Sequence, residues 1–146
     1  MTTWGGTYIK GTIFKMQTDG NGYALLHEFA GGADDGAKPC GSLILSGSTL
    51  FGMTNSGGNN LSGTIFKLQT DGSSYAVLHE FAGGISDGKY PWGDLLLCGS
   101  TLFGMTLLGG KDDSGTIFNI ETDGTSYSLL HEFAGGVGDG KIPAGP

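Results

Sequence analysis

One period runs through the whole chain and constrains its fold more than any other feature. The sequence Gly-Thr-Ile-Phe begins at Gly11, Gly63 and Gly115, so successive copies are 63 − 11 = 52 and 115 − 63 = 52 residues apart. The sequence His-Glu-Phe-Ala-Gly-Gly recurs three times with the same spacing. Repeats of about fifty residues are typical of modular folds, because each unit buries its apolar surface only against its neighbours.

Each repeat contains four short β-like runs closed by turn residues. In the copy over residues 42–93 the predicted strands are 42–45 (A), 49–54 (B), 63–70 (C) and 75–81 (D). Asp-Gly pairs end the C strands and supply the positive-φ residue that a tight hairpin turn requires; they begin at Asp19, Asp71 and Asp123. No segment has the apolar periodicity and capping residues of a helix.

This pattern predicts an all-β fold made of β-propeller-type blades. Four antiparallel strands in a repeat of about fifty residues are the signature of a propeller blade. The runs are apolar on both faces, which fits sheets that pack face to face better than a flat sandwich with one solvated side. A β-solenoid would need a shorter period of roughly 20–30 residues.

The chain is out of phase with its blades. Three periods would need 3 × 52 = 156 residues, and the equivalents of residues 43–52 are absent. We therefore divide the chain into a partial blade with strands C and D (1–41) and two blades (42–93 and 94–146), about two and a half to three blades in all. Open blade edges favour a homo-oligomer, most simply a dimer with six blade-equivalents. The alternative is a fragment of a longer repeat array.

The repeat resembles a known family. The unit GTIFKLQTDGSSYAVLHEFAGG, with LILSGSTLFGMT before the next unit, is similar to the tandem repeats named for Gloeobacter and Verrucomicrobia (GloVer repeats). The resemblance covers almost the whole chain. It implies a propeller-like, exported or surface-anchored bacterial protein, and it implies no particular chemistry. The N-terminal residues do not form a signal peptide, so localisation stays open.

Composition excludes several partners. The formal net charge is −7, with 7 basic and 14 acidic residues, which argues against a nucleic-acid ligand and gives no attraction to an anionic membrane. No apolar run approaches the roughly 20 residues that span a bilayer, so we expect no membrane insertion. Cys40 and Cys98 are predicted at opposite ends of A strands, so both are expected to be free thiols.

The loops predicted on one face are long and varied and are the best place for a site. The D-to-A loops are predicted over 31–41 and 83–93, and the B-to-C loops over 2–10, 54–62 and 106–114. Binding residues concentrate on such loops when a rigid scaffold carries them. The candidate ligand-binding residues on this face are Trp4, Tyr8, Asn59, Asn60, Tyr90, Trp92, Lys111, Asp112 and Asp113.

These residue types fit carbohydrate binding. Aromatic rings stack on the apolar faces of sugars, while carboxylates and amides bind the hydroxyl groups. A protein partner is a second possible ligand of the same face. In the alternative interpretation, Tyr90 and Trp92 only fill gaps between blades.

A cation site is a weaker hypothesis. Asp35, Asp87 and Asp139 recur within Gly-Gly-x-x-Asp-Gly, and calcium is the cation they would suit. Calcium takes six to eight oxygen ligands, and one carboxylate per loop supplies too few. We therefore expect no cofactor and interpret these side chains as hydrogen-bonding to their own loops.

Catalysis has little support in the sequence, and no residue is assigned a catalytic role. His-Glu-Phe-Ala-Gly is not the zinc motif HExxH; its histidines, which are His27, His79 and His131, are expected to pack between blades. The predicted function is a non-catalytic binding or scaffold module, with extracellular glycans as possible ligands. The alternatives are a purely structural repeat fragment and a polysaccharide-active enzyme that uses paired carboxylates such as Asp34/Asp35 or Asp112/Asp113.

Overall fold

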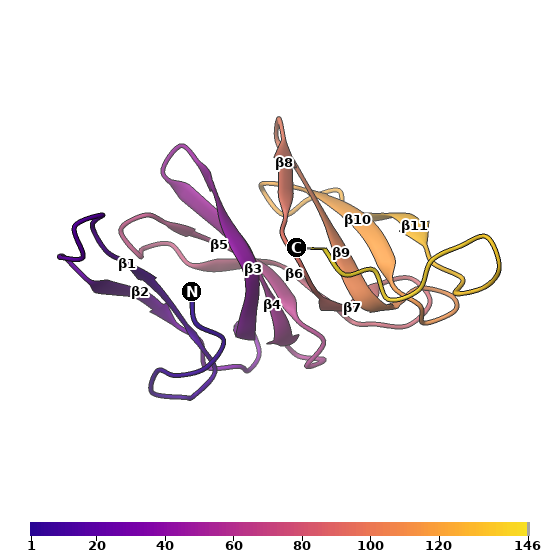
Figure 1. Ribbon diagram of the computed structural model, residues 1–146, viewed down its shortest axis with the longest axis horizontal. Coiled ribbons are helices and arrows are strands. Elements are labelled where there is room, and N and C mark those ends of the chain that lie inside the picture. Colours follow the sequence, from indigo (N-terminus) through magenta and orange to yellow (C-terminus); the bar gives the residue numbers. More distant parts are fainter. Residues whose placement is uncertain (146) are drawn as a thin grey trace.

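Three antiparallel sheets lie side by side in the order of the sequence (Figure 1). The computed structural model describes residues 1–145, and that range contains eleven strands and no helix. The all-β prediction is confirmed. Since this range holds no helix, it also holds no helix able to span a membrane.

The strands of each sheet follow one another along the chain. The first sheet pairs β1 (Thr12–Lys15) with β2 (Ala24–Glu28). The central sheet has the order β3 (Gly36–Ser46), β4 (Thr49–Gly57), β5 (Thr64–Gln69), β6 (Ala76–Glu80). The third sheet places β7 (Gly88–Pro91) and β8 (Leu96–Cys98) beside β9 (Thr101–Gly109), followed by β10 (Thr116–Glu121) and β11 (Ser128–Glu132).

The A strand differs from the prediction. Residues 31–41 were expected to form a loop, but β3 begins at Gly36 and pairs with β4 from its first residue. An irregularity between Cys40 and Ile44 bends this strand, and in the third sheet the equivalent bend separates β7 from β8. Pro39 is compatible with this strand because β3 lies at the edge of its sheet, where the missing N–H of a proline is not needed.

The B-to-C loops are also shorter than predicted, because β4 and β9 continue to Gly57 and Gly109. The polar run after Met53 was interpreted as loop. Instead, the Thr54 hydroxyl is fully buried; it lies 2.8 Å from the Thr64 hydroxyl and donates to the Ser56 carbonyl. A threonine whose hydroxyl is satisfied in this way is compatible with a buried strand.

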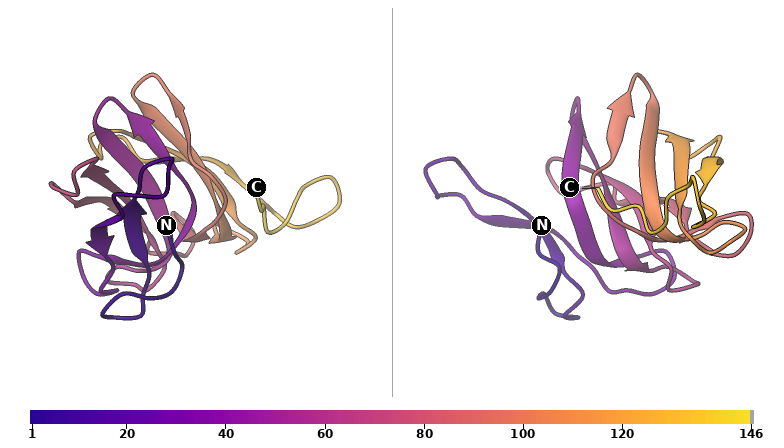
Figure 2. Two further views of the ribbon diagram at one scale, coloured as in Figure 1. Left: turned by 60° about the vertical axis from the view of Figure 1, so that its left-hand side comes forward. Right: turned by 45° about the vertical axis from the view of Figure 1, so that its right-hand side comes forward.

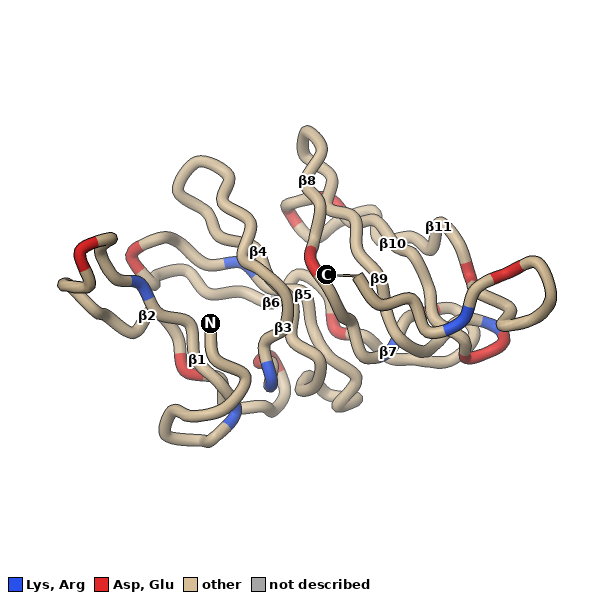
Figure 3. The backbone as a smooth tube through the Cα atoms, in the orientation of Figure 1, with Lys and Arg blue, Asp and Glu red and all other residues tan. Residues whose placement is uncertain are grey.

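The predicted Asp-Gly turns are confirmed. Between β5 and β6, Asp71 Oδ1 accepts a hydrogen bond from the Ser73 amide at 2.8 Å, and Gly72 has φ = 90°. The turns at the end of the sheets that carries the Asp-Gly pairs are short. Figure 3 shows that charged residues lie mostly at strand ends and in turns.

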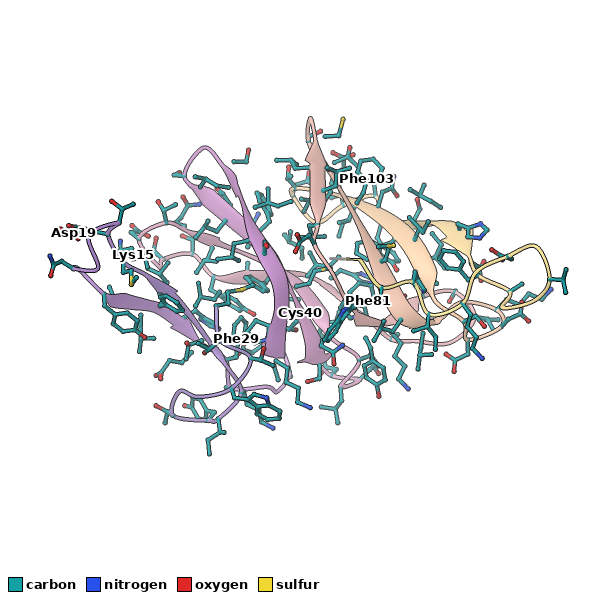
Figure 4. The ribbon with its side chains drawn as sticks, in the orientation of Figure 1. Lys15, Asp19, Phe29, Cys40, Phe81 and Phe103 are labelled. Carbon is teal, nitrogen blue, oxygen red and sulfur yellow. The ribbon has the colours of Figure 1, made fainter. Side chains whose placement is uncertain are left out.

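Aromatic side chains fill the space between neighbouring sheets. Phe29 and Phe81 are buried and pack edge-to-face on Phe66 and Phe118, with 5.3 Å between ring centroids in both cases. Figure 4 shows these two phenylalanines on either side of β3. Burying one such ring stabilises the fold by about 1.5–3 kcal/mol relative to leaving it exposed. The sheets therefore hold together as consecutive blades of one stack.

The A strands of successive sheets meet along one side of the stack. The Ser42 amide donates to Asp94 Oδ1 at 2.7 Å, and a Cβ placed on Gly41 would overlap the Gly93 carbonyl. Gly93 in turn lies against Gly145. Figure 2 shows the β1–β2 turn and the segment before the C-terminus projecting away from the stack.

Candidate functional site

Each repeat brings the histidine of its D strand to an aspartate eight residues later. His27, His79 and His131 place Nε2 at 3.1, 3.2 and 3.2 Å from the nearest aspartate oxygen. The partners are Asp35, Asp87 and Asp139. These are the three carboxylates that the sequence suggested as a weak cation site.

Backbone amides also donate hydrogen bonds to these carboxylates. Asp87 accepts hydrogen bonds from the Ala82 amide and the Gly88 amide, both at 2.7 Å. Burial acts to raise the pKa of Asp87, but the hydrogen bonds from His79 and these neighbours outweigh it, so the pKa lies below its ordinary value. The carboxylate therefore stays ionised and closes the turn before β7.

A tyrosine from the next sheet completes the cluster. Tyr75 stacks on His27, and Tyr127 stacks on His79, with 3.8 Å between ring centroids in both pairs. The Tyr127 hydroxyl donates to Asp87 Oδ1 at 2.6 Å. Burial and the neighbouring carboxylate raise the pKa of Tyr127 far above its ordinary value, so the hydroxyl keeps its proton.

This His–Asp–Tyr cluster joins neighbouring sheets, as the prediction of inter-blade histidines required. The aspartates contribute their oxygens to this joint and to the backbone amides of their own loops. Among residues 1–145, no three His, Cys, Asp or Glu side chains gather in an arrangement that would hold a metal ion.

The glutamate of the His-Glu-Phe sequence holds the B-to-C turn, a role that the sequence analysis missed. Glu80 Oε2 accepts hydrogen bonds from the Asn59 amide at 3.1 Å and from Asn59 Nδ2 at 2.7 Å. Glu28 and Glu132 accept from the equivalent turn amides of Thr7 and Lys111. The constant separation of 21 residues between turn and glutamate was a sequence signal for this contact.

The predicted site residues of the B-to-C turns come from three different turns. Tyr8, Asn60 and Asp112 occupy the same position in three different repeats, one repeat apart from each other. Asp113 Oδ1 accepts a hydrogen bond from the Gly109 amide at 2.8 Å and so closes its own turn. Lys111 contributes its backbone amide to Glu132.

One cavity on this side of the molecule does contain a predicted residue. It has a volume of about 300 Å³ and lies between the A strands of the central and third sheets. Trp92 lines it, and its indole is 44% exposed. The other lining residues are Met1, Thr3, Lys38, Pro39, Cys40, Gly41, Asn55 and Gly93.

Two further aromatic residues of the predicted site lie close to lysines of β3 and β7. The Lys38 ammonium lies 5.0 Å from the ring centroid of Trp4, so Lys38 connects Trp4 to the cavity. The Lys89 ammonium lies 4.8 Å from the ring centroid of Tyr90. These are cation–π contacts that hold exposed aromatic rings in place.

The cavity thiol stays protonated at neutral pH. Burial, helped by the charge of Asp94, raises the pKa of Cys40 to about 12, and Sγ donates to the Pro91 carbonyl at 3.3 Å. The thiolate is the reactive form of cysteine, so this side chain is inert at neutral pH. Cys98 is exposed, and both cysteines are free, as predicted.

A second hollow, of about 450 Å³, lies among the short turns at the other end of the strands. Its lining is largely polar and contains none of the predicted site residues; it comprises Ser46, Thr49, Phe51, Lys67, Gln69, Gly99, Ser100 and Thr122. Without an exposed tryptophan or tyrosine it offers no platform for a sugar ring.

The repeat pattern and the sheets that it builds agree with a family model. The model described as "Gloeobacter/Verrucomicrobia repeat" matches residues 1–146. This chain belongs to the Gloeobacter/Verrucomicrobia repeat family. The resemblance expected from the sequence is thereby confirmed for this repeat protein, while no curated protein matches it.

Two solved structures share the fold of this Gloeobacter/Verrucomicrobia repeat protein. A chain in the "Crystal structure of Nidogen/Laminin Complex" is 17% identical with a TM-score of 0.59; the match covers 94% of this chain and 44% of that one. The putative TolB from Agrobacterium tumefaciens is 16% identical with a TM-score of 0.55; the match covers 92% of this chain and 45% of that one. The repeat protein thus has a β-propeller-like fold and spans less than half the length of either chain.

Proposed function

We propose that this repeat protein is a non-catalytic binding module whose cavity beside Trp92 takes a sugar ring of an extracellular glycan. The observation that carries the proposal is the half-exposed Trp92 indole in the wall of a 300 Å³ cavity. A cavity of that size accommodates one monosaccharide unit and leaves a longer chain free to extend over the face.

The chemistry of the cavity wall supports a neutral or weakly acidic sugar. The indole offers an apolar face for ring stacking, and Pro39 extends that apolar surface. Lys38 and Asn55 add hydrogen-bond donors for hydroxyl or carboxylate oxygens, although Asn55 Nδ2 already donates to the Pro91 carbonyl at 3.3 Å.

The carboxylates of the loops support binding over hydrolysis. A glycosidase needs one carboxyl group as acid and another as base or nucleophile, both directed at the same bond. Asp35 is held by His27 and by the amides of Ala30 and Gly36, and Asp113 closes its own turn. Carboxylates fixed in this way contribute to the scaffold.

Tryptophan fluorescence tests the proposal directly, because the chain has only two tryptophans. We would titrate it with hexasaccharides of neutral and uronic-acid polysaccharides. Saturable quenching is expected in the unchanged chain, and calorimetric titration with the same hexasaccharides should show binding that disappears in Trp92→Ala and persists in Ile85→Ala, an exposed side chain outside the cavity. Binding that survives in Trp92→Ala, or no saturable binding to any oligosaccharide, contradicts the proposal. Release of reducing ends during the titration would favour the hydrolase.

We also propose that two copies assemble into one propeller. The solved chains that share the fold are more than twice as long as the part matched here, since 44% and 45% of each is covered. Two copies would supply six blade-equivalents. Such an assembly buries the apolar sheet faces that a single copy leaves open.

A further inference from the structure

Two opposite faces of the stack expose side chains whose counterparts are packed elsewhere. Tyr23 is 61% exposed, while the equivalent Tyr75 and Tyr127 stack on histidines of the preceding sheet. At the other end, the His131 side chain is 48% exposed, compared with 20% for His79. Each open face thus carries one half of the His–Asp–Tyr cluster.

In each half the aromatic rings already have the geometry of their packed counterparts. On the first face, the rings of Phe14 and Tyr23 lie 5.5 Å apart at 30°, and the buried pair Phe66–Tyr75 lies 5.8 Å apart at 28°. On the last face, His131 and Phe133 are 4.7 Å apart at 84°. In the preceding sheet the equivalent rings, those of His79 and Phe81, lie 4.8 Å apart at 84°.

The strand segments that would pair at these two faces also match each other. In the central sheet Gly36 is paired with Gly57, and a Cβ on Gly57 would come within 2.6 Å of the facing backbone. Their equivalents are Gly140 (36 + 104) and Gly5 (57 − 52). In the described chain, a Cβ on Gly5 would meet nothing within 4 Å, and one on Gly140 would meet only the Phe133 ring.

The segment that contains Gly140 is preformed for pairing. Ile142 has φ = 54°, close to 56° at Lys38 and 59° at Tyr90, the equivalent residues of β3 and β7. Its amide donates to the Ser114 carbonyl at 2.8 Å, as that of Tyr90 does to Ser62. The backbone at Ile142 therefore already has the conformation and the hydrogen bond of the equivalent positions in β3 and β7.

We propose that residues 140–145 of one copy pair antiparallel with residues 1–5 of a second copy, forming a composite sheet. Gly140 lies opposite Gly5, and Pro143 lies opposite Thr2, as Pro39 lies opposite Thr54. Tyr23 of the second copy stacks on His131 of the first and donates to Asp139. This inference rests on the proposed assembly and specifies its interface, a head-to-tail contact that closes into a ring.

Light scattering on a sizing column tests the interface with two pairs of variants. A Cβ at position 140 would overlap Thr2 of the next copy, as one at Gly36 would lie 2.4 Å from the Thr54 side chain. Gly140→Ala and Tyr23→Ala should each weaken self-association at least about tenfold and shift the mass toward the 15.0 kDa of one chain. Gly136→Ala and Tyr8→Ala, the matched controls at open positions, should leave the mass unchanged.

The outcomes separate this interface from the assembly itself. A multimer that is lost only in Gly140→Ala and Tyr23→Ala supports the interface, provided that their circular dichroism is unchanged. A multimer whose mass is the same in all four variants overturns the interface but leaves an assembly through another surface. A monomer at every concentration overturns both, and the oligosaccharide titration is unaffected by that result.

Discussion

The hydroxyl of Tyr127 donates to Asp87 Oδ1 with 2.6 Å between the two oxygens, and Asp87 lies in the connection that leads from the central sheet into the third. The same aspartate lies beside His79, on which the tyrosine ring stacks. His79 of the central sheet thus contacts both a tyrosine of the third sheet and the aspartate of the connection between them. Buried polar clusters of this kind hold two surfaces in one relative position.

Loss of this hydroxyl should loosen the joint. Tyr127→Phe removes a donor to an ionised carboxylate, and we expect the free energy of unfolding in urea to fall by about 1–2 kcal/mol. Tyr8→Phe is the matched control, since the Tyr8 hydroxyl belongs to an exposed side chain outside the cluster. Its removal should change stability by less than about 0.5 kcal/mol. Equal losses in the two variants would show that the Tyr127 hydrogen bond contributes nothing.

Acid should destabilise the fold through the same aspartates. The folded-state pKa values of Asp35 and Asp87 lie below the ordinary 3.8, because hydrogen bonds to the ionised form outweigh burial. The unfolded chain therefore binds more protons in acid, so this stability is complete above about pH 5 and falls as the pH drops through 3.8. Thermal unfolding between pH 6 and pH 3 measures it. In Asp87→Asn the midpoint of thermal unfolding should fall less between pH 6 and pH 3. An unchanged fall would assign the effect to other groups.

A methyl group at Gly52 should disrupt the central sheet. A Cβ there would lie 2.5 Å from the Phe66 ring and 2.8 Å from Leu43, both in the core between sheets. Overpacking of this kind costs about 1–3 kcal/mol, so Gly52→Ala should lower the midpoint of urea unfolding. Gly32→Ala adds the same group in open space at an ordinary φ and should be neutral or slightly stabilising. A tolerated Gly52→Ala would mean that the ring moves away freely.

The two thiols should react at very different rates. Cys98 is exposed at the end of β8, whereas the Cys40 thiol is partly buried and its pKa is raised to about 12. Iodoacetamide at pH 8, followed by mass spectrometry of peptides, should label Cys98 first, and Cys40 should react only after urea unfolds the chain. Rapid labelling of Cys40 in the folded protein would show that the wall of the cavity opens.

Much of the fold was predictable because local chemistry repeats every 52 residues. Asp71 and Gly72 specify a hairpin turn whatever surrounds them, and the prediction there was confirmed. The A strand was predicted too short because Pro39 and Gly41 break local pairing signals. Only the edge position of β3, a property of the assembled sheet, makes these residues acceptable in a strand.

The candidate site was less predictable than the fold. Trp92 was singled out from its loop and lines a cavity, but most of the wall comes from β3, β4 and the N-terminal residues, which belong to the other two sheets. Glu80 was not singled out at all, although it holds the turn that carries Asn59. Its role depends on a contact between strand D and a turn 21 residues away, which neither segment reveals alone.

The sequence by itself determined the family, the 52-residue repeat, the strand class and the hairpin turns, because each depends on residues near one another in the chain. Tertiary structure decided which side chains meet. His79, Asp87 and Tyr127 come from different strands and turns, and only the stacking of two sheets places the tyrosine on the other two. Long-range contacts of this kind depend on the relative position of sheets, which packing determines and local pattern does not.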